Sequence, residues 1–167
     1  MSELTVRPLA EADLAAVVAG ITSRDPAQHR RRLAEHQRDT GFTELIAWID
    51  DVAVGFVGLG LFDDASPDEM MESRGFALVY DLHVEEPFRR RGAGRALMTA
   101  LEDRARAMGA PGVILDTGTG VDFAAARALY HSMGYINQMS VYLGGWSDPD
   151  HPGVHYVDRL TTWLKPF

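Results

Sequence analysis

The fold of this chain is decided by residues 80–95, which read YDLHVEEPFRRRGAGR. Residues 76–85 have the composition of a β-strand, and residues 92–108 carry apolar side chains at helical spacing. A tight turn with two glycines joins them. A turn that opens a helix directly presents the unpaired N–H groups and the partial positive charge of the helix N-terminus. The segment therefore predicts an anion site of the kind that binds phosphate.

The side chains of the turn support this prediction. Gly92 and Gly94 lack side chains, so the backbone can closely approach a diphosphate. Four arginines, whose planar, forked donors suit phosphate, surround them: Arg89, Arg90, Arg91 and Arg95. A glycine turn beside a solvated arginine surface is the plainer alternative. A P-loop is excluded because no Gly-Lys-Ser/Thr follows, and a Rossmann fingerprint because the third glycine is absent.

Composition limits the remaining classes. The 167 residues fit one domain, 1–167, and the absence of cysteine excludes disulfides and thiolate metal sites. The net charge of −8 argues against nucleic acid as a partner. No apolar run approaches the roughly 20 residues that span a bilayer, and no secretory signal opens the chain. We therefore expect a cytoplasmic protein that does not bind membranes.

The other patterns predict a mixed sheet. Strands are expected at residues 4–8, 43–49, 52–62, 112–117, 135–143 and 156–164, and helices at residues 10–21, 25–38 and 122–134. Residues 63–74 read as an acidic loop and residues 144–153 as a turn-rich segment. Asp122 is expected to cap the last helix. This order of elements predicts an α/β (α+β) domain.

Two motifs resemble the GNAT superfamily of acetyltransferases. Arg89-x-x-Gly92-x-Gly94 matches the family's Q/R-x-x-G-x-G/A motif, and residues 126–135 match its A-x-x-L-Y-x-x-x-G-F/Y segment. The opening Val6-Arg7-Pro8 is also similar. The resemblance implies the GNAT acyl-CoA N-acyltransferase fold, with a central sheet of about 6–7 strands that contains a splayed pair, flanked by about 4 helices. It also implies an N-acetyltransferase that moves the acetyl group of acetyl-CoA to an amine, without a metal.

The resemblance assigns cofactor-binding positions. In the family the diphosphate lies over the turn and the pantetheine arm lines up with the preceding strand. The corresponding residues here are Leu82, His83, Val84, Arg89, Arg90, Arg91, Gly92, Ala93, Gly94, Arg95 and Phe123. The backbone N–H of Val84 is the expected polariser of the thioester carbonyl. Phe123 stands where many members have an asparagine.

Catalytic candidates follow from the same match. Tyr130 occupies the position whose hydroxyl protonates the departing thiolate, although it would also serve as a core aromatic. An amine has a pKa of about 10.4, so a base helps to remove its proton. Asp81, His83 and Glu85 share one strand face and are the candidates. His83 has the most suitable ordinary pKa.

The acceptor is less determined. The acidic loop could attract a cationic amine, or could simply be solvated. An aromatic C-terminal region could form a pocket wall, ordinary packing or the contact of a homodimer: Trp146, His151, His155, Tyr156 and Trp163. The acceptor is expected to be a small-molecule or peptide amine. Rival functions are a non-catalytic acyl-CoA sensor of the same fold, an enzyme that uses another nucleotide at this turn, and a structural domain without a ligand.

Overall fold

The computed structural model describes residues 3–38, 41–61, 75–147 and 151–167. The strands are β1 (Leu4–Pro8), β2 (Thr43–Ile49), β3 (Val52–Leu61), β4 (Ala77–Val84), β5 (Gly112–Gly118), β6 (Ile136–Ser147) and β7 (His155–Pro166). The helices are α1 (Leu14–Gly20), α2 (Pro26–Arg38), α3 (Ala93–Ala107) and α4 (Ala124–Ser132). The predicted acidic loop at residues 63–74 lies outside the described residues.

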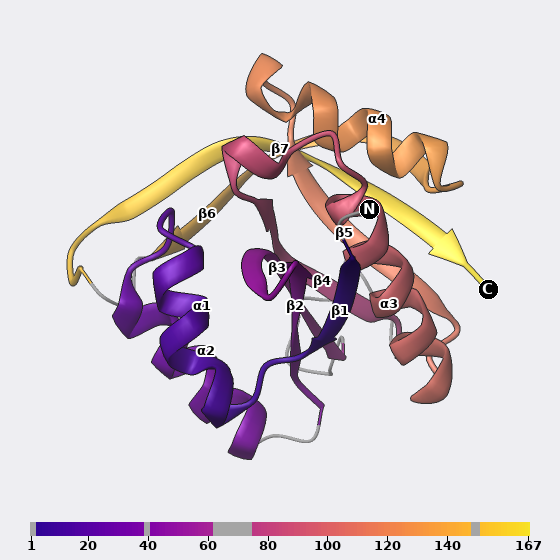
Figure 1. The fold of residues 1–167 in the computed structure, drawn as a ribbon. Helices are drawn as coiled ribbons and strands as arrows, with labels where there is room; N and C mark the ends of the chain where they lie inside the picture. Colours follow the sequence, from indigo (N-terminus) through magenta and orange to yellow (C-terminus); the bar gives the residue numbers. More distant parts are fainter. Residues whose placement is uncertain (1–2, 39–40, 62–74, 148–150) are drawn as a thin grey trace.

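The strands form one mixed sheet. Their order is β1-β2-β3-β4-β5-β7-β6, and every neighbouring pair is antiparallel except β4 and β5, which are parallel. The expected mixed sheet of about 6–7 strands with about 4 helices is confirmed. Figure 1 shows the first half of the sheet between α1 and α2 on one side and α3 on the other.

The alternation of β2 explains these layers. Leu45, Ala47 and Ile49 belong to the core cluster that contains the buried face of α3, whereas Ile46 and Trp48 belong to the cluster beneath α1 and α2. Successive side chains of a strand point to opposite faces. A strand covered on both faces is buried throughout, and all seven residues of β2 are buried.

The parallel pair β4–β5 separates along its length. Only Ala77 and Leu78 of β4 pair with Val113 and Ile114 of β5. Beyond these residues β4 continues to Val84 and β5 to Gly118 without pairing to each other. The expected splayed pair is therefore confirmed, and it opens a gap in the middle of the sheet.

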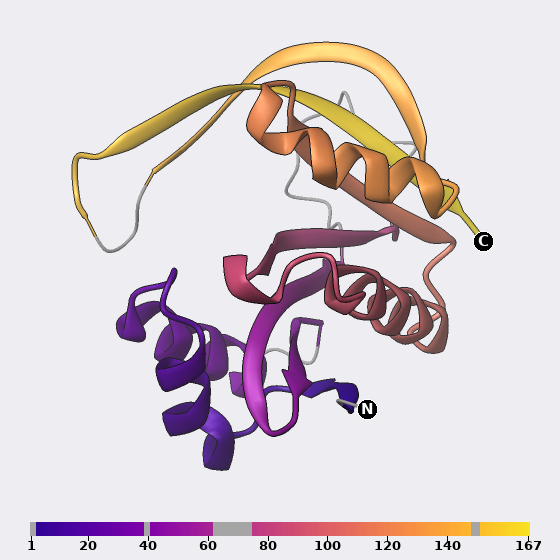
Figure 2. The same ribbon diagram turned by 45° about the horizontal axis from the view of Figure 1, so that its top comes forward.

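Three local predictions were wrong. Asp122 does not cap α4, because α4 begins after a short 3-10 turn and Phe123 occupies the cap position without a side-chain hydrogen bond. The helix expected at residues 10–21 is divided into a 3-10 turn and α1. β6 extends to Ser147, into the segment expected to form turns, because it pairs with β7 over its far end. Figure 2 shows this long hairpin arching away from the body.

Candidate active site

A β-bulge in β4 shapes the site. His83 pairs with Phe56 of β3 and Tyr80 pairs with Gly58, so Asp81 and Leu82 together oppose one residue. Asp81 takes a left-handed conformation with φ of 51°. As a result Asp81 and Tyr80 both face α2, where Arg32 contacts each of them. Leu82 and Val84 pack with the opposite core cluster.

The backbone of Val84 faces the gap between β4 and β5. The N–H of Glu85 donates to the carbonyl of Val54 at 2.9 Å, and Val84 opposes Gly55. Bonded and non-bonded pairs alternate in an antiparallel ladder. Val84 and Gly55 therefore form a non-bonded pair, and the N–H and C=O of Val84 point away from β3. A Cβ added at Gly55 would lie 2.6 Å from the carbonyl oxygen of His83, so this close approach requires glycine.

The glycine turn forms the mouth of α3. Arg90 and Gly92 have φ of 64° and 89°, a left-handed geometry that suits glycine at the second position. Gly92 is the N-cap residue of α3, and because it has no side chain it cannot cap the N–H groups of the first turn. The first N–H groups of the helix have no partner within the helix. They are therefore available to an anion.

A cavity of about 420 Å³ lies beside this turn. Gly94 lines it, and an added Cβ there would already be in van der Waals contact with Leu129 at 3.4 Å and Val84 at 3.8 Å. The cavity is lined by Leu82, Val84, Phe88, Arg89, Arg90, Gly92, Ala93, Gly94, Arg95, Ala125, Ala126 and Leu129. Its wall thus combines an apolar floor with backbone donors and arginines at one end, which fits a long ligand with a phosphate group and an apolar arm.

The arginines of the turn have different positions. Arg89 donates from Nε to the carbonyl of Val84 at 2.9 Å, and Arg95 donates to Ser132 of α4 at 2.7 Å. Arg91 lies over the ring of Phe88, 5.5 Å from its centroid. Arg90 lines the cavity and Arg91 does not. Three of the four arginines, Arg89, Arg90 and Arg95, therefore line the cavity, and Arg89 and Arg95 also tie the turn to its neighbours.

A second cavity of about 550 Å³ lies on the other side of β4. It is lined by Ser23, Arg24, Gln28, Arg31, Arg32, Phe56, Asp81, Leu82, His83, Trp146, Ser147 and Tyr156. Trp146 and Tyr156 stack at 5.6 Å on the far end of the β6–β7 hairpin. Figure 1 shows that this hairpin reaches toward the side of α1 and α2. Leu82 lines both cavities, which places them back to back across β4.

Asp81 and His83 both face this second cavity. Asp81 accepts from Arg32 at 2.9 Å, and Arg24 lies 3.7 Å from it. His83 stacks on Phe56 at 5.5 Å. Burial lowers the pKa of His83, the charge of Glu85 opposes this effect and Arg89 reinforces it, so the pKa stays below its usual value. The ring is therefore neutral at physiological pH.

Tyr130 lies in the core beside the first cavity. Its ring packs 5.8 Å from Tyr135 and 6.2 Å from Trp163. Burial raises the pKa of Tyr130 to about 12. Among the described residues, Ala126 and Leu129 of α4 line the cavity and Tyr130 does not. The phenol remains protonated at physiological pH, which leaves it a hydrogen-bond donor.

Phe123, another expected cofactor residue, lies at the N-terminal end of α4. Its ring packs on the end of β5, where a Cβ at Gly118 would lie 2.4 Å from it. Among the described residues it does not line the first cavity.

Several residues of the second cavity were missed by reasoning from sequence. Arg24 is buried, forms an ion pair with the buried Glu44 and lies 3.5 Å over the ring of Phe56. Ser23 contacts both His83 and Glu85. A lone arginine or serine between two helices carries no motif, so no signal in the sequence could have found them.

Comparison with known proteins fits this geometry. A family model described as the acetyltransferase (GNAT) family matches residues 12–135. No curated protein matches the chain. Among the described residues, no helix is long and apolar enough to cross a membrane.

Solved structures share the fold. The chain is similar to the ribosomal-protein-alanine N-acetyltransferase of Brucella melitensis, with 23% identity and a TM-score of 0.72 over 98% of this chain and 99% of that one. It is also similar to yncA of Salmonella typhimurium, solved with its cofactor acetyl-CoA, with 20% identity and a TM-score of 0.68 over 98% and 93%. Such identities show the fold alone. Because the family model covers most of the sequence, the chain belongs to the acetyltransferase (GNAT) family.

Proposed function

We propose that this protein transfers an acetyl group from acetyl-CoA to an amine by direct attack of the amine on the thioester. One observation carries the proposal: two cavities lie back to back across β4 and share Leu82. The first has the apolar wall and backbone donors that suit coenzyme A. The second has the polar side chains that an amine needs. Reactants that enter from opposite sides would meet at the end of the unpaired part of β4.

The backbone of β4 and α3 would hold the cofactor. The N–H groups at the mouth of α3 would bind the diphosphate, and Arg90 would add charge. The N–H of Val84, which points into the gap, would donate to the thioester oxygen as negative charge develops on it. These donors are fixed by the fold before the ligand arrives, so they need little reorganisation during the reaction.

Side chains would move the protons. His83 or Asp81 would accept the proton of the amine from the second cavity. Tyr130 would donate a hydrogen bond to the departing sulfur. A phenol with a pKa of about 12 is about 3.5 units less acidic than an ordinary thiol at about 8.5. Complete proton transfer would cost about 5 kcal/mol, unless burial also raises the pKa of the thiol. Hydrogen bonding is therefore the role we assign to Tyr130.

The acceptor would be a small-molecule or peptide amine. One of the similar structures is named as a ribosomal-protein-alanine N-acetyltransferase, from Brucella melitensis, and that name indicates a protein substrate. The open second cavity of this chain is compatible with a peptide N-terminus. A metal is not part of this mechanism. We also propose that the protein is cytoplasmic and that residues 1–167 form one domain. A contact through the closing strands, β6 and β7, would make a homodimer.

A thioester-cleavage assay tests the proposal. Acetyl-CoA is mixed with the protein and with aliphatic amines, aromatic amines and short peptides, and free thiol and acetylated amine are both measured. We expect equal amounts of the two products with at least one amine. Tight binding with no cleavage would favour the sensor. Competition between coenzyme A and ATP or NAD addresses the other nucleotide ligands.

Thermal unfolding provides an independent readout. A ligand that binds only the folded state stabilises it by mass action. Acetyl-CoA at 100 to 1,000 times its dissociation constant should add about 2.7–4.1 kcal/mol. A structural domain without a ligand would show no shift with any of these compounds.

A further inference from the structure

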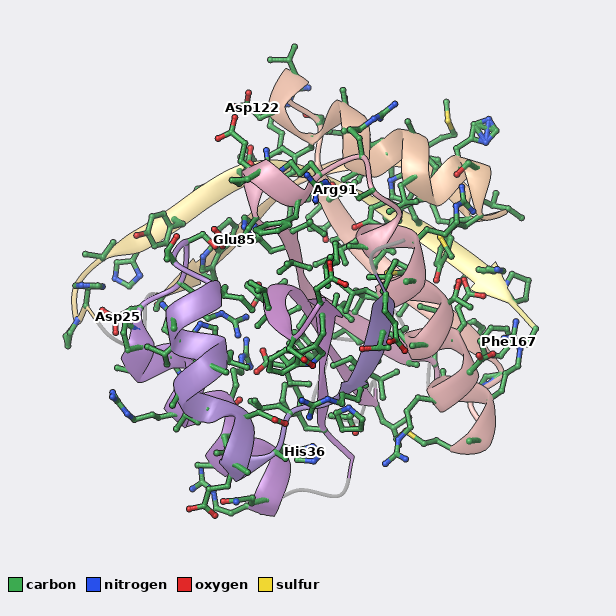
Figure 3. All side chains as sticks on the ribbon, in the orientation of Figure 1. Asp25, His36, Glu85, Arg91, Asp122 and Phe167 are labelled. Atoms are coloured by element: carbon green, nitrogen blue, oxygen red, sulfur yellow. The ribbon has the colours of Figure 1, made fainter. Side chains whose placement is uncertain are left out.

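Three side chains from two distant segments meet at the edge of the second cavity. Ser23 Oγ lies 2.9 Å from Nε2 of His83, and the same hydroxyl donates to Oε1 of Glu85. Nε2 of His83 lies 3.4 Å from that same carboxylate oxygen. In the view of Figure 3, Glu85 lies between α1 and the turn that carries Arg91. Of these three described residues, Ser23 and His83 line the cavity, whereas Glu85 contacts both of them without lining it.

The hydrogen bonds define which nitrogen of His83 carries the proton. Glu85 is buried, and burial alone would raise its pKa. Hydrogen bonds from the hydroxyl and N–H of Ser23 and from Thr22 outweigh burial and keep the pKa of Glu85 below its usual range, so Glu85 is ionised. A serine hydroxyl has one proton, and Ser23 donates it to this carboxylate. Nε2 of His83 therefore faces two acceptors and must be the protonated nitrogen.

The remaining contacts fix the plane of the ring. Phe56 of β3 stacks on His83 with an interplanar angle of 23°. The charged groups that act on His83 are Glu85 on its own strand, Arg89 after β4, and Arg24 from the segment between α1 and α2. One edge of the ring is thus held by Ser23 and Glu85 and one face by Phe56. In the neutral ring, Nδ1 has the free lone pair.

We propose that Ser23 and Glu85 are positioning residues that hold His83 with its proton on Nε2, so that Nδ1 is the base that accepts the proton of the amine. This inference rests on the proposed function. The amine nitrogen bonds to the acetyl carbon, the C–S bond breaks with its electron pair on sulfur, and the amine proton moves to Nδ1. The imidazolium that forms is stabilised by Glu85 through the hydrogen bonds on the opposite nitrogen.

Nitrogen NMR of histidine tests the tautomer without any acceptor. The chain has six histidines, and a His83→Gln variant identifies the resonances of His83. In the wild-type protein we expect Nε2 at the chemical shift of a protonated nitrogen and Nδ1 at that of a lone pair. The opposite assignment would overturn the proposal whatever the activity.

Two variants separate positioning from simple structural support. Glu85→Gln removes the charge and supplies an amide N–H that can donate to the Ser23–His83 pair, so we expect Nδ1 to become the protonated nitrogen. Thr22→Val is the matched control. It removes the donor to the other oxygen of Glu85, 3.3 Å away, and leaves the contact between Ser23 and His83. We expect the wild-type tautomer in this control, and a reversed tautomer there would contradict the argument.

Kinetics with the best amine of the panel completes the test. Glu85→Gln should lower kcat by about 100-fold or more, with unchanged affinity for coenzyme A. Glu85 raises the pKa of His83, so its loss should move the acid limb of the pH profile to lower pH. Ser23→Ala should lower kcat less, and Ser23→Thr should restore it. If the acid limb of the pH profile does not move in Glu85→Gln and the proton stays on Nε2 of His83, Glu85 has only a structural role.

The two proposals fail differently. If no amine is acetylated, the proposed function fails and the base role fails with it, while the tautomer result stands. If acetylation occurs and Glu85→Gln retains full kcat, only the positioning role is lost.

Discussion

The two cavities beside β4 are lined by different kinds of chemical groups. The first uses backbone groups and small residues within one stretch of chain, from Leu82 to Arg95, with one face of α4 as its second wall. The second uses long side chains from α2, from the segment before it and from the hairpin of β6 and β7. A single strand separates them. A site built from backbone tolerates variation of its side chains, whereas a site built from side chains changes with each substitution.

The difference teaches where specificity resides. Under the proposed function, the first cavity recognises one invariant ligand shape, which backbone N–H groups in a fixed turn do well. The acceptor side rests on buried ionisable groups, such as the ion pair between Arg24 and Glu44. Burial raises the pKa of Glu44, and Arg24 opposes this effect. The acceptor side should therefore respond to pH and to single substitutions more than the donor side does.

The largest effect is expected at the mouth of α3. Gly92→Glu places a side chain where φ is 89° and adds a negative charge beside the proposed diphosphate site. We expect the dissociation constant of coenzyme A, measured by calorimetry, to rise by about 100-fold or more.

Gly109→Glu is the matched control for this change. Gly109 also has a positive φ, of 78°, and nothing lies within 4 Å of an added Cβ. It follows the other end of α3, so the helix, at 15 residues, separates it from Gly92 by about 22 Å. Affinity for coenzyme A should be unchanged, and a similar loss in both variants would attribute the effect to strain alone.

The next effect concerns how the stability of the folded protein responds to acid. His29 of α2 is fully buried against Phe56, and burial, together with the charge of Arg24, lowers its pKa to about 4. The unfolded chain, with a pKa of about 6.5, binds the proton more readily, so stability is present above pH 6.5 and is lost as pH falls toward 4. We expect the free energy of unfolding in urea to decrease by up to about 2 kcal/mol between pH 7 and pH 5.

His29→Gln should remove this part of the pH dependence, because glutamine does not titrate. An equal loss between pH 7 and pH 5 in both proteins would assign the effect to other groups.

A smaller effect is expected where the two sides meet. Tyr130→Phe removes one hydroxyl and keeps the packing against Tyr135 and Trp163. The loss of one hydrogen bond to the departing sulfur should lower kcat by about tenfold, with little change in the affinity for coenzyme A. Tyr135→Phe removes a hydroxyl from the same aromatic cluster and should retain kcat. Equal kcat in Tyr130→Phe and the wild type would remove Tyr130 from its role.

The smallest effect separates two neighbouring arginines. Arg90 lines the first cavity, whereas Arg91 lies over Phe88. Both are exposed, so solvent and salt weaken their contribution. Arg90→Ala should weaken binding of coenzyme A by about three- to tenfold at low salt, and Arg91→Ala by less. The reverse order would place the diphosphate on the other side of the turn.

The strand, turn and helix around the first cavity could be predicted from the sequence. The run from Leu82 to Arg95 is contiguous, so its strand, turn and helix could be recognised from local pattern, and the structure places most of these residues around one cavity. Phe123 was inferred from its position in a motif, and the structure places its ring on Gly118 instead of in that cavity. The bulge that turns Asp81 toward Arg32 depends on pairing with β3 and could not be seen in β4 alone.

The sequence by itself determined most of the elements and the glycine turn that opens α3, because glycine conformation, helix ends and hydrophobic periodicity act over a few neighbouring residues. Only the tertiary structure decided the second cavity. Ser23 meets His83 and Glu85 across about sixty residues of chain, and Trp146 reaches the same cavity from the hairpin. Contacts of this range follow from how helices and strands pack together, and no local pattern in either partner specifies the other.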